Sequence, residues 1–185
     1  LGAQQLPSNQ VLAALSMFIT LLVMGPTWKQ VYQEGIVPYS NGEVELSDAW
    51  ENGKKPLVSF MGRQIDRAGN TEDVWLFYRH LPPESLSLEN SDGAELPTTY
   101  EDVPIQVLLP AFLLSELKTA FLIGFQIYLP FLILDLVVAT VTTSMGMLML
   151  PPTLLSLPFK LMLFVLVDGW RLIVGMLLNG ISMTG

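Results

Sequence analysis

Six formally charged side chains lie in an otherwise very apolar stretch between Pro110 and Arg171: Glu116, Lys118, Asp135, Lys160, Asp168 and Arg171. A charged group in hydrocarbon is costly unless it is paired or faces a polar cavity. Two aspartates in apolar helices could share a proton and hydrolyse peptides, as the paired carboxylates of aspartyl proteases do. However, neither Asp135 nor Asp168 stands in the GxGD pattern that lets water and a substrate backbone approach. We therefore interpret both aspartates as partners of lysines, or as caps of backbone groups between subunits.

The sequence lacks the residue patterns that usually bind a metal or a cofactor. The chain has no cysteine and one histidine, His80, which stands at the end of an expected helix. A lone histidine without cysteine cannot build a zinc site unless several carboxylates join it. None of the GxSxG, P-loop, GxGxxG or HExxH motifs occurs. We predict no metal site, no cofactor and no enzyme activity, and interpret His80 as a helix-end or surface residue.

The charged residues near position 116 need partners from elsewhere in the molecule. Glu116 and Lys118 are two residues apart and lie on different faces of a helix, so they do not pair with each other. Lys160, on the returning arm of a helical hairpin, is the natural partner for Glu116, and we predict an ion pair between neighbouring subunits. The alternative is that Lys160 extends its ammonium group to a membrane interface. The remaining members of the set are expected to be buried polar helix residues: Lys118, Asp135, Asp168 and Arg171.

A methionine-rich segment directly precedes Pro151 and Pro152. Met145, Met147 and Met149 alternate around Gly146 at the expected tip of a hairpin. Methionine is flexible and polarizable, and it fills irregular gaps. In a single chain this segment is simply an apolar tip. Repeated around a symmetry axis, the four residues Met145, Gly146, Met147 and Met149 would form a soft apolar gasket that closes a pore.

The elements that must position these residues are apolar helices. From Thr119 to Phe159 the chain has 41 residues and one formal charge. A continuous helix of this length would reach about 60 Å, roughly twice the hydrocarbon thickness of a bilayer. Prolines mark where it can break. We expect a helix over 111–129 that meets Pro130 and continues to about Ser144, and a last helix over about 154–178 that stops at Asn179-Gly180. An N-terminal helix should begin near Gln10 and end at Gly25-Pro26.

An acidic insert separates the apolar parts. Residues 29–110 hold 14 acidic and 6 basic residues, a net charge of −8, whereas the rest of the chain holds three of each. An acidic surface argues against binding nucleic acid, and an insert poor in Lys and Arg is more typical of the extracytoplasmic side. We expect one helix from Ser47, interrupted at Gly53 and Pro56, and a helix that restarts at Pro56. Another should be capped by Thr71, with Val74, Phe77 and Tyr78 packing in a core.

The expected fold class is all-α, because the sequence shows no strand alternation and no internal repeat. At 51% hydrophobic residues the chain is too apolar for an ordinary soluble protein. The expected parts are an N-terminal apolar helix (1–28), the acidic extracytoplasmic insert (29–110, with a solvated linker over 82–104) and kinked C-terminal helical hairpins (111–185, with the methionine-rich loop over 145–150). These features predict a membrane-associated subunit of an assembly with an interior to line.

The apolar C-terminal part contains four long motifs: Pro110-Ala-Phe-Leu-Leu-Ser-Glu-Leu-Lys-Thr-Ala-Phe121, Leu129-Pro-Phe-Leu-Ile-Leu-Asp-Leu-Val137, Met145–Pro152 and Leu157–Trp170. These motifs resemble those of the FliP family, the core export-gate proteins of bacterial flagella, with SctR relatives in virulence injectisomes. The segment Glu-Leu-Lys-Thr-Ala-Phe is closer to the flagellar branch than to the injectisome branch. The sequence departs from the family at Ser8, where Pro is common, and over 82–102, which is longer and more acidic than expected.

The resemblance implies a type III secretion function at the bacterial inner membrane, in the flagellar basal body. It implies a cleaved signal peptide and a further apolar helix before Leu1, and a pentameric ring assembled with FliQ and FliR and joined by FlhB and FlhA. Unfolded secreted proteins would cross through its pore, with the insert on the periplasmic side and lipid around the helices. Three alternatives stay open: a small ion channel or ion-coupled transporter with Asp135 or Asp168 as its ion site, a purely structural scaffold, and the injectisome counterpart of the gate.

Overall fold

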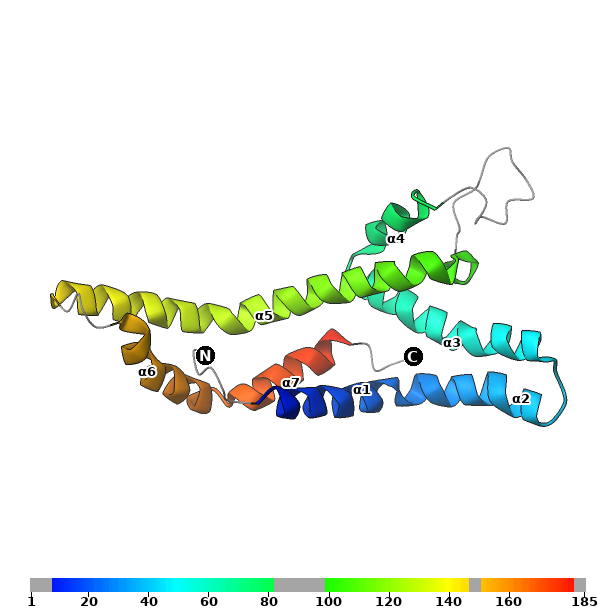
Figure 1. Ribbon diagram of the computed structural model, residues 1–185, viewed down its shortest axis with the longest axis horizontal. Helices are drawn as coiled ribbons and strands as arrows, with labels where there is room; N and C mark the ends of the chain where they lie inside the picture. The colour runs from blue at the N-terminus through cyan, green and yellow to red at the C-terminus, as the bar shows by residue number, and fades with distance from the viewer. Residues whose placement is uncertain (1–7, 82–98, 147–150, 182–185) are drawn as a thin grey trace. The chain divides into compact units, whose positions relative to one another are not determined.

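Every regular element that the structure describes is a helix. The computed structural model describes residues 8–81, 99–146 and 151–181, and these ranges contain α-helices, one π-helical segment and one 3-10 turn (Figure 1). The all-α prediction is therefore confirmed. The helices fall into two compact units, Leu1–Ile19 with Ala120–Ile181, and Thr20–Thr119 with Ser182–Gly185. We call the first the hairpin unit and the second the insert unit, and describe each by itself.

The first helix is longer than the sequence predicts. Helix α1 runs over Asn9–Val31 with Pro26 inside it, and it continues without a break into η1 (Tyr32–Ile36, π-helical) and α2 (Val37–Ser40). The expected end at Gly25-Pro26 is wrong. Proline removes one backbone N–H, but ending a helix among apolar residues would leave several backbone groups unpaired. Continuing the helix through the proline therefore costs less free energy than ending it there.

Helix α3 (Leu46–Arg67) returns along α2 and η1 in the insert unit (Figure 1). Its backbone approaches η1 closely at two glycines: a Cβ on Gly35 would lie 3.0 Å from the Cα of Gly53 and 3.0 Å from the carbonyl oxygen of Ala49. The expected interruption at Gly53 and Pro56 is wrong, since α3 passes through both. Gly53 is explained by this packing contact, and it is not a helix break.

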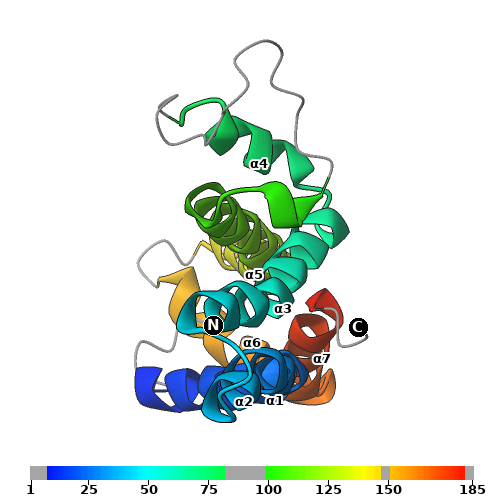
Figure 2. The ribbon, with the colours of Figure 1, turned by 90° about the vertical axis from the view of Figure 1, so that its right-hand side faces the viewer.

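The insert unit has a hydrophobic core of its own. Helix α4 (Thr71–Tyr78) and the turn η3 (Tyr100–Asp102) pack with α3 and the first turns of α5 (Ile105–Ser144), as Figure 2 shows end-on. The buried members are Val58, Met61, Ile65, Val74, Val103, Val107, Leu108 and Ala111, with Phe60, Phe77 and Tyr78 partly buried against them. The expectation that Val74, Phe77 and Tyr78 pack in a core is confirmed.

Capping in this unit differs from the prediction by one residue. The N-cap of α4 is Asn70, and Thr71 is already the first helical residue. The Thr71 hydroxyl donates instead to the carboxylate of Asp66, at 3.3 Å, and the same oxygen of Asp66 accepts from the Tyr100 hydroxyl. Asp66 therefore fastens the end of α3 to the start of α4 through Thr71 and to η3 through Tyr100.

The hairpin unit is built on the apolar C-terminal helices. Helix α5 passes through Pro110 and Pro130 without a break and ends at Ser144 as predicted, and α6 (Pro152–Leu166) turns back from that end (Figure 1). The single last helix expected over about 154–178 is wrong. A bend of 62° separates α6 from α7 (Gly169–Gly180). Asp168, at the bend, is in the left-handed conformation with φ 49°.

Two of the described helices are long and apolar enough to cross a membrane: Asn9–Ser40 and Ile105–Ser144. The bent pair α6–α7 would be a third if it forms one span. Only 6% of the most apolar window of α5 is buried in the chain. Exposed apolar area of this extent requires lipid or other protein as a neighbour.

Candidate functional site

A buried polar cluster joins α5 to α6 in the hairpin unit. The Lys160 ammonium lies 2.5 Å from Asp135 Oδ2, and the Ser156 hydroxyl donates to Asp135 Oδ1 at 2.5 Å. The Lys160 side chain is 7% exposed and that of Asp135 is 23% exposed. Ser156 and Lys160 are one helical turn apart on α6, so both face α5 together. Both carboxylate oxygens are thus engaged, and the hairpin is closed by a charge-assisted clamp.

This cluster changes the interpretation of Lys160. The sequence assigned Lys160 to Glu116 of a neighbouring subunit, on the premise that each lacked a partner, whereas Lys160 has a partner within its own chain. Glu116 is half-buried, and its carboxylate has no ion-pair partner among the residues described here. The pair between subunits stays a prediction, with Lys160 already engaged.

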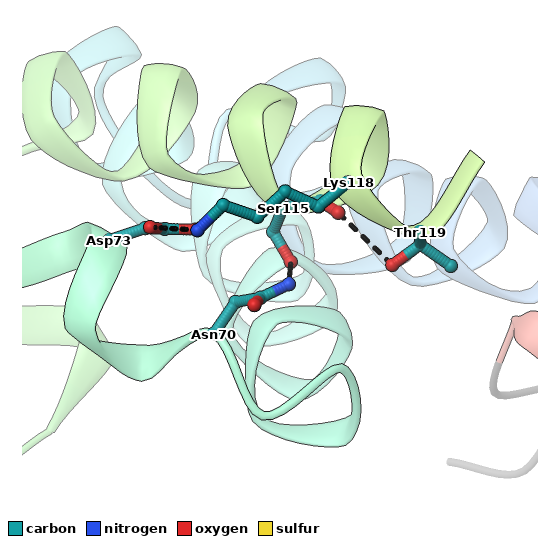
Figure 3. A network of polar contacts seen from close by, with 5 residues as sticks. All are labelled: Asn70, Asp73, Ser115, Lys118 and Thr119. Atoms are coloured by element: carbon teal, nitrogen blue, oxygen red, sulfur yellow. Dashed lines mark hydrogen bonds and ion pairs between the residues drawn. The ribbon is translucent and has the colours of Figure 1, made fainter. Parts of the chain in front are cut away.

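A second ion pair fastens α4 to α5 in the insert unit (Figure 3). The Lys118 ammonium lies 2.5 Å from Asp73 Oδ1, with side chains 49% and 8% exposed respectively. One turn away, Asn70 donates from its amide to the hydroxyl of the fully buried Ser115 at 3.0 Å. Lys118 and Glu116 do not pair, as the two-residue spacing predicted. The expected buried position of Lys118 is replaced by a half-exposed one, because its ammonium reaches Asp73 at the surface of the unit.

The bend between α6 and α7 is lined by aromatic rings. A Cβ on Gly169 would lie 2.2 Å from Cε2 of Phe164, so only glycine fits beneath this ring. The Phe164 ring also meets Trp170 edge-on at 5.6 Å and tilts against Phe131 at 6.5 Å between centroids. Asp168 and Arg171 lie beside the bend and are exposed on the chain, not buried as the sequence suggested. The bend is therefore held by packing of rings.

The methionine segment is described only in part. Met145 is 68% exposed and Gly146 has φ 75°, a left-handed conformation that glycine adopts without strain. Met147 and Met149 lie outside the described residues. The gasket therefore stays a prediction, and Met145 presents an exposed thioether directly after the end of α5.

Sequence reasoning did not find Asp73, Asn70, Ser115 or Ser156. Asp73 and Lys118 are 45 residues apart, and no local spacing could have joined them. Ser156, four residues before Lys160, did carry a signal, because a serine and a lysine on one face of an apolar helix imply a shared polar partner. His80 lies at the end of α4, as predicted, with Nδ1 2.7 Å from the carbonyl oxygen of Leu76.

Within the described ranges no three His, Asp or Glu side chains gather as a metal site would require.

Comparison with known proteins finds relatives along nearly the whole chain, and residues 1–177 match the FliP family. The chain is 48% identical over 179 residues to the flagellar biosynthetic protein FliP of Pectobacterium carotovorum, covering 96% of this chain and 63% of that protein. It is 46% identical over 181 residues to the protein of the same name from Caulobacter vibrioides (97% and 62%). For the Bacillus subtilis protein the identity is 42% over 179 residues (97% and 74%). The chain thus spans 62% to 74% of the length of these three relatives.

Proposed function

The chain belongs to the FliP family, and from this premise we propose that it is a core subunit of a flagellar type III secretion export gate. Several copies form a pore through which unfolded flagellar proteins cross the bacterial inner membrane. The observation that carries the proposal is the α5–α6 hairpin. It is closed by a buried ion pair, is apolar on its outer surface and ends in an exposed methionine.

Support for this proposal comes from the apolar surface of the hairpin, most of which its own chain leaves uncovered. A buried lysine–aspartate pair ties α6 to α5 as one hairpin arm, while most of the surface of α5 is left without a partner in the chain. An arm of this kind suits an assembly in which identical arms stand side by side around an axis. We propose that the assembly includes FliQ and FliR, with FlhB and FlhA joining it. In this arrangement residues 29–110 lie on the periplasmic side.

Within this gate, we assign the seal to Met145, Met147 and Met149 with Gly146 as their flexible neighbour. Thioethers from several copies can exclude water and still deform around a passing chain. The test is the triple substitution to alanine, which removes bulk without adding charge. We expect assembly to survive while ions and small solutes leak through the inner membrane of cells that express it.

The matched control is Met162→Ala, because Met162 is also exposed, at 60%, but lies within α6. This variant should stay as tight as the unsubstituted protein. An assembled triple variant that does not leak would show that the seal lies elsewhere.

A second candidate, a small ion channel or ion-coupled transporter, would use Asp135 or Asp168 as its ion site. The engagement of both Asp135 carboxylate oxygens by Ser156 and Lys160 argues against Asp135 in that role. The flagellar names of the relatives favour the flagellar gate over its injectisome counterpart. Loss of flagellin secretion without loss of membrane potential, in cells lacking the gene, would separate the gate from the ion-coupled alternative.

A further inference from the structure

One face of α7 is polar, although α7 belongs to a candidate membrane span. Arg171, Gly175 and Asn179 recur every four residues and therefore share one side of α7, and Asp168 stands directly before the first residue of the helix. Together with Val167, Leu172 and Met176 they line an open hollow of about 380 Å³. This is many times the volume that one water molecule needs.

The charges on this face are not neutralised within the chain. The side chains of Asp168 and Arg171 form no ion pair with any residue that the structure describes, and both are exposed. Arg171 also stands in the first turn of α7, where the helix dipole repels a positive charge. Neither group gains enough from its own chain to offset transfer into hydrocarbon.

The opposite face of α7 is apolar. Ile173 and Leu177 lie about half a turn away from Gly175, and they are apolar and partly buried. A Cβ on Gly175 would meet no atom within 4 Å, so the hollow is open at its centre. An open hollow that carries one positive and one negative group suits water, which can solvate both signs at once.

We propose that the polar face of α7 is wetted and lines the aqueous passage of the assembled gate. This inference rests on the proposed function, because it needs a passage to line. Asp168 offers acceptors and Arg171 offers donors, so an extended polypeptide of any sequence finds hydrogen-bond partners at this face. The gap at Gly175 leaves room for its side chains.

Cysteine scanning tests the proposal, since the 185 residues contain no cysteine. Gly175→Cys and Asn179→Cys would be introduced singly into the complete protein in its native bacterium, with all other cysteines of that protein removed. Ile173→Cys and Leu177→Cys are the matched controls on the other face of the same helix. Each assembled complex is treated with a water-soluble maleimide, and labelling and flagellin secretion are both measured.

We expect the thiols on the polar face to react at least about tenfold faster than the controls, because the thiolate is the nucleophile and a thiol in lipid stays protonated. Labelling of Gly175→Cys should also reduce secretion severalfold. Equal labelling of both faces, or labelling of the polar face only after the complex is taken apart, would overturn the inference. If the polar face stays unlabelled while cells lacking the gene fail to secrete flagellin, this inference fails and the proposed gate stands. If cells lacking the gene still secrete flagellin, the proposed function fails as well.

Discussion

Two ion pairs between residues far apart in the sequence have the same length but different surroundings. Asp135–Lys160 and Asp73–Lys118 each place a lysine nitrogen 2.5 Å from a carboxylate oxygen. In the hairpin unit the lysine is the buried partner, at 7% exposure, and the surrounding helices are apolar on their outer surface. In the insert unit the lysine is 49% exposed and the aspartate, at 8%, is buried against a hydrophobic core.

This contrast indicates which interactions hold each unit together. The insert unit has a continuous apolar core, so its ion pair adds to a structure that is already packed. The hairpin unit has few buried apolar residues in the described part, with Phe131 the main one on α5, and its arms depend on polar and aromatic contacts. Loss of one charge should therefore matter more in the hairpin unit.

The largest effect is expected from reversing Lys160. Lys160→Glu places two carboxylates against each other inside the hairpin, and removing a buried partner alone costs about 3–5 kcal/mol. We expect loss of the folded complex, measured by thermal unfolding and native gels of protein in detergent. Asp135→Lys in the same chain should restore it in part.

Glu116→Lys is the matched rescue for the predicted pair between subunits. Rescue of Lys160→Glu by Glu116→Lys, and not by Asp135→Lys, would show that the contact between subunits dominates. The comparison between the two units would then need to include that interface.

The next effect is expected at the bend of the hairpin unit. Gly169→Ala drives a methyl group into the Phe164 ring, and overpacking of this kind costs about 1–3 kcal/mol. Gly175→Ala, six residues further along α7, meets open space and should be neutral or slightly stabilising in the same thermal assay. If both variants unfold at the same temperature, the Phe164 ring does not hold the bend.

A smaller effect is expected from Lys118→Met in the insert unit. The substitution strands the buried carboxylate of Asp73, but the half-exposed position limits the loss to about 1–2 kcal/mol, between the values for exposed and buried pairs. Added salt should reduce the difference from the unsubstituted protein, because it screens an exposed lysine. A loss as large as that of Lys160→Glu would remove the distinction between the two pairs.

The smallest effect is a pH dependence of the insert unit. Burial, followed by the hydrogen bond to Asp66, raises the pKa of Tyr100 to about 12. The folded unit holds the phenol proton more tightly than the unfolded chain, so this contribution to stability is complete below about pH 10 and is lost as the pH rises through 12. We expect thermal stability to fall more steeply between pH 10 and 12 than in Tyr100→Phe. Parallel pH curves for the two proteins would contradict the assignment.

Local pattern was enough to predict the helices and much of the core. The apolar spacing of α4 identified Val74 as a core residue, and the end of α5 at Ser144 followed from the composition after it. The wrong predictions concern where helices end or are interrupted. Pro26 was expected to end a helix and Pro56 to interrupt one, yet α1 and α3 continue through them. A proline removes one hydrogen bond, whereas the surrounding apolar residues make a frayed helix end more costly.

The contacts of the candidate site were harder to predict because they join residues far apart in the sequence. Asp135 and Lys160 are 25 residues apart, and their pairing depends on how α6 turns back along α5. The bend at Asp168 depends on a ring from the preceding helix resting on Gly169, which no periodicity reveals. The family resemblance, by contrast, depended on motifs that are visible in the sequence itself.

The π-helical segment η1 determines the angle between the side chains that precede it and those that follow it around the helix axis. A π turn takes up one residue more than an α turn, and each residue turns the helix by about 100°. The turns from Thr20 to Val31 therefore present their side chains at a different angle from those of α2, with the change at the Gly35–Gly53 contact. Deleting one residue from Tyr32–Ile36 would rotate all of those side chains about the helix axis at once. The number of residues in this segment is thus as much a structural constraint as the identity of any one of them.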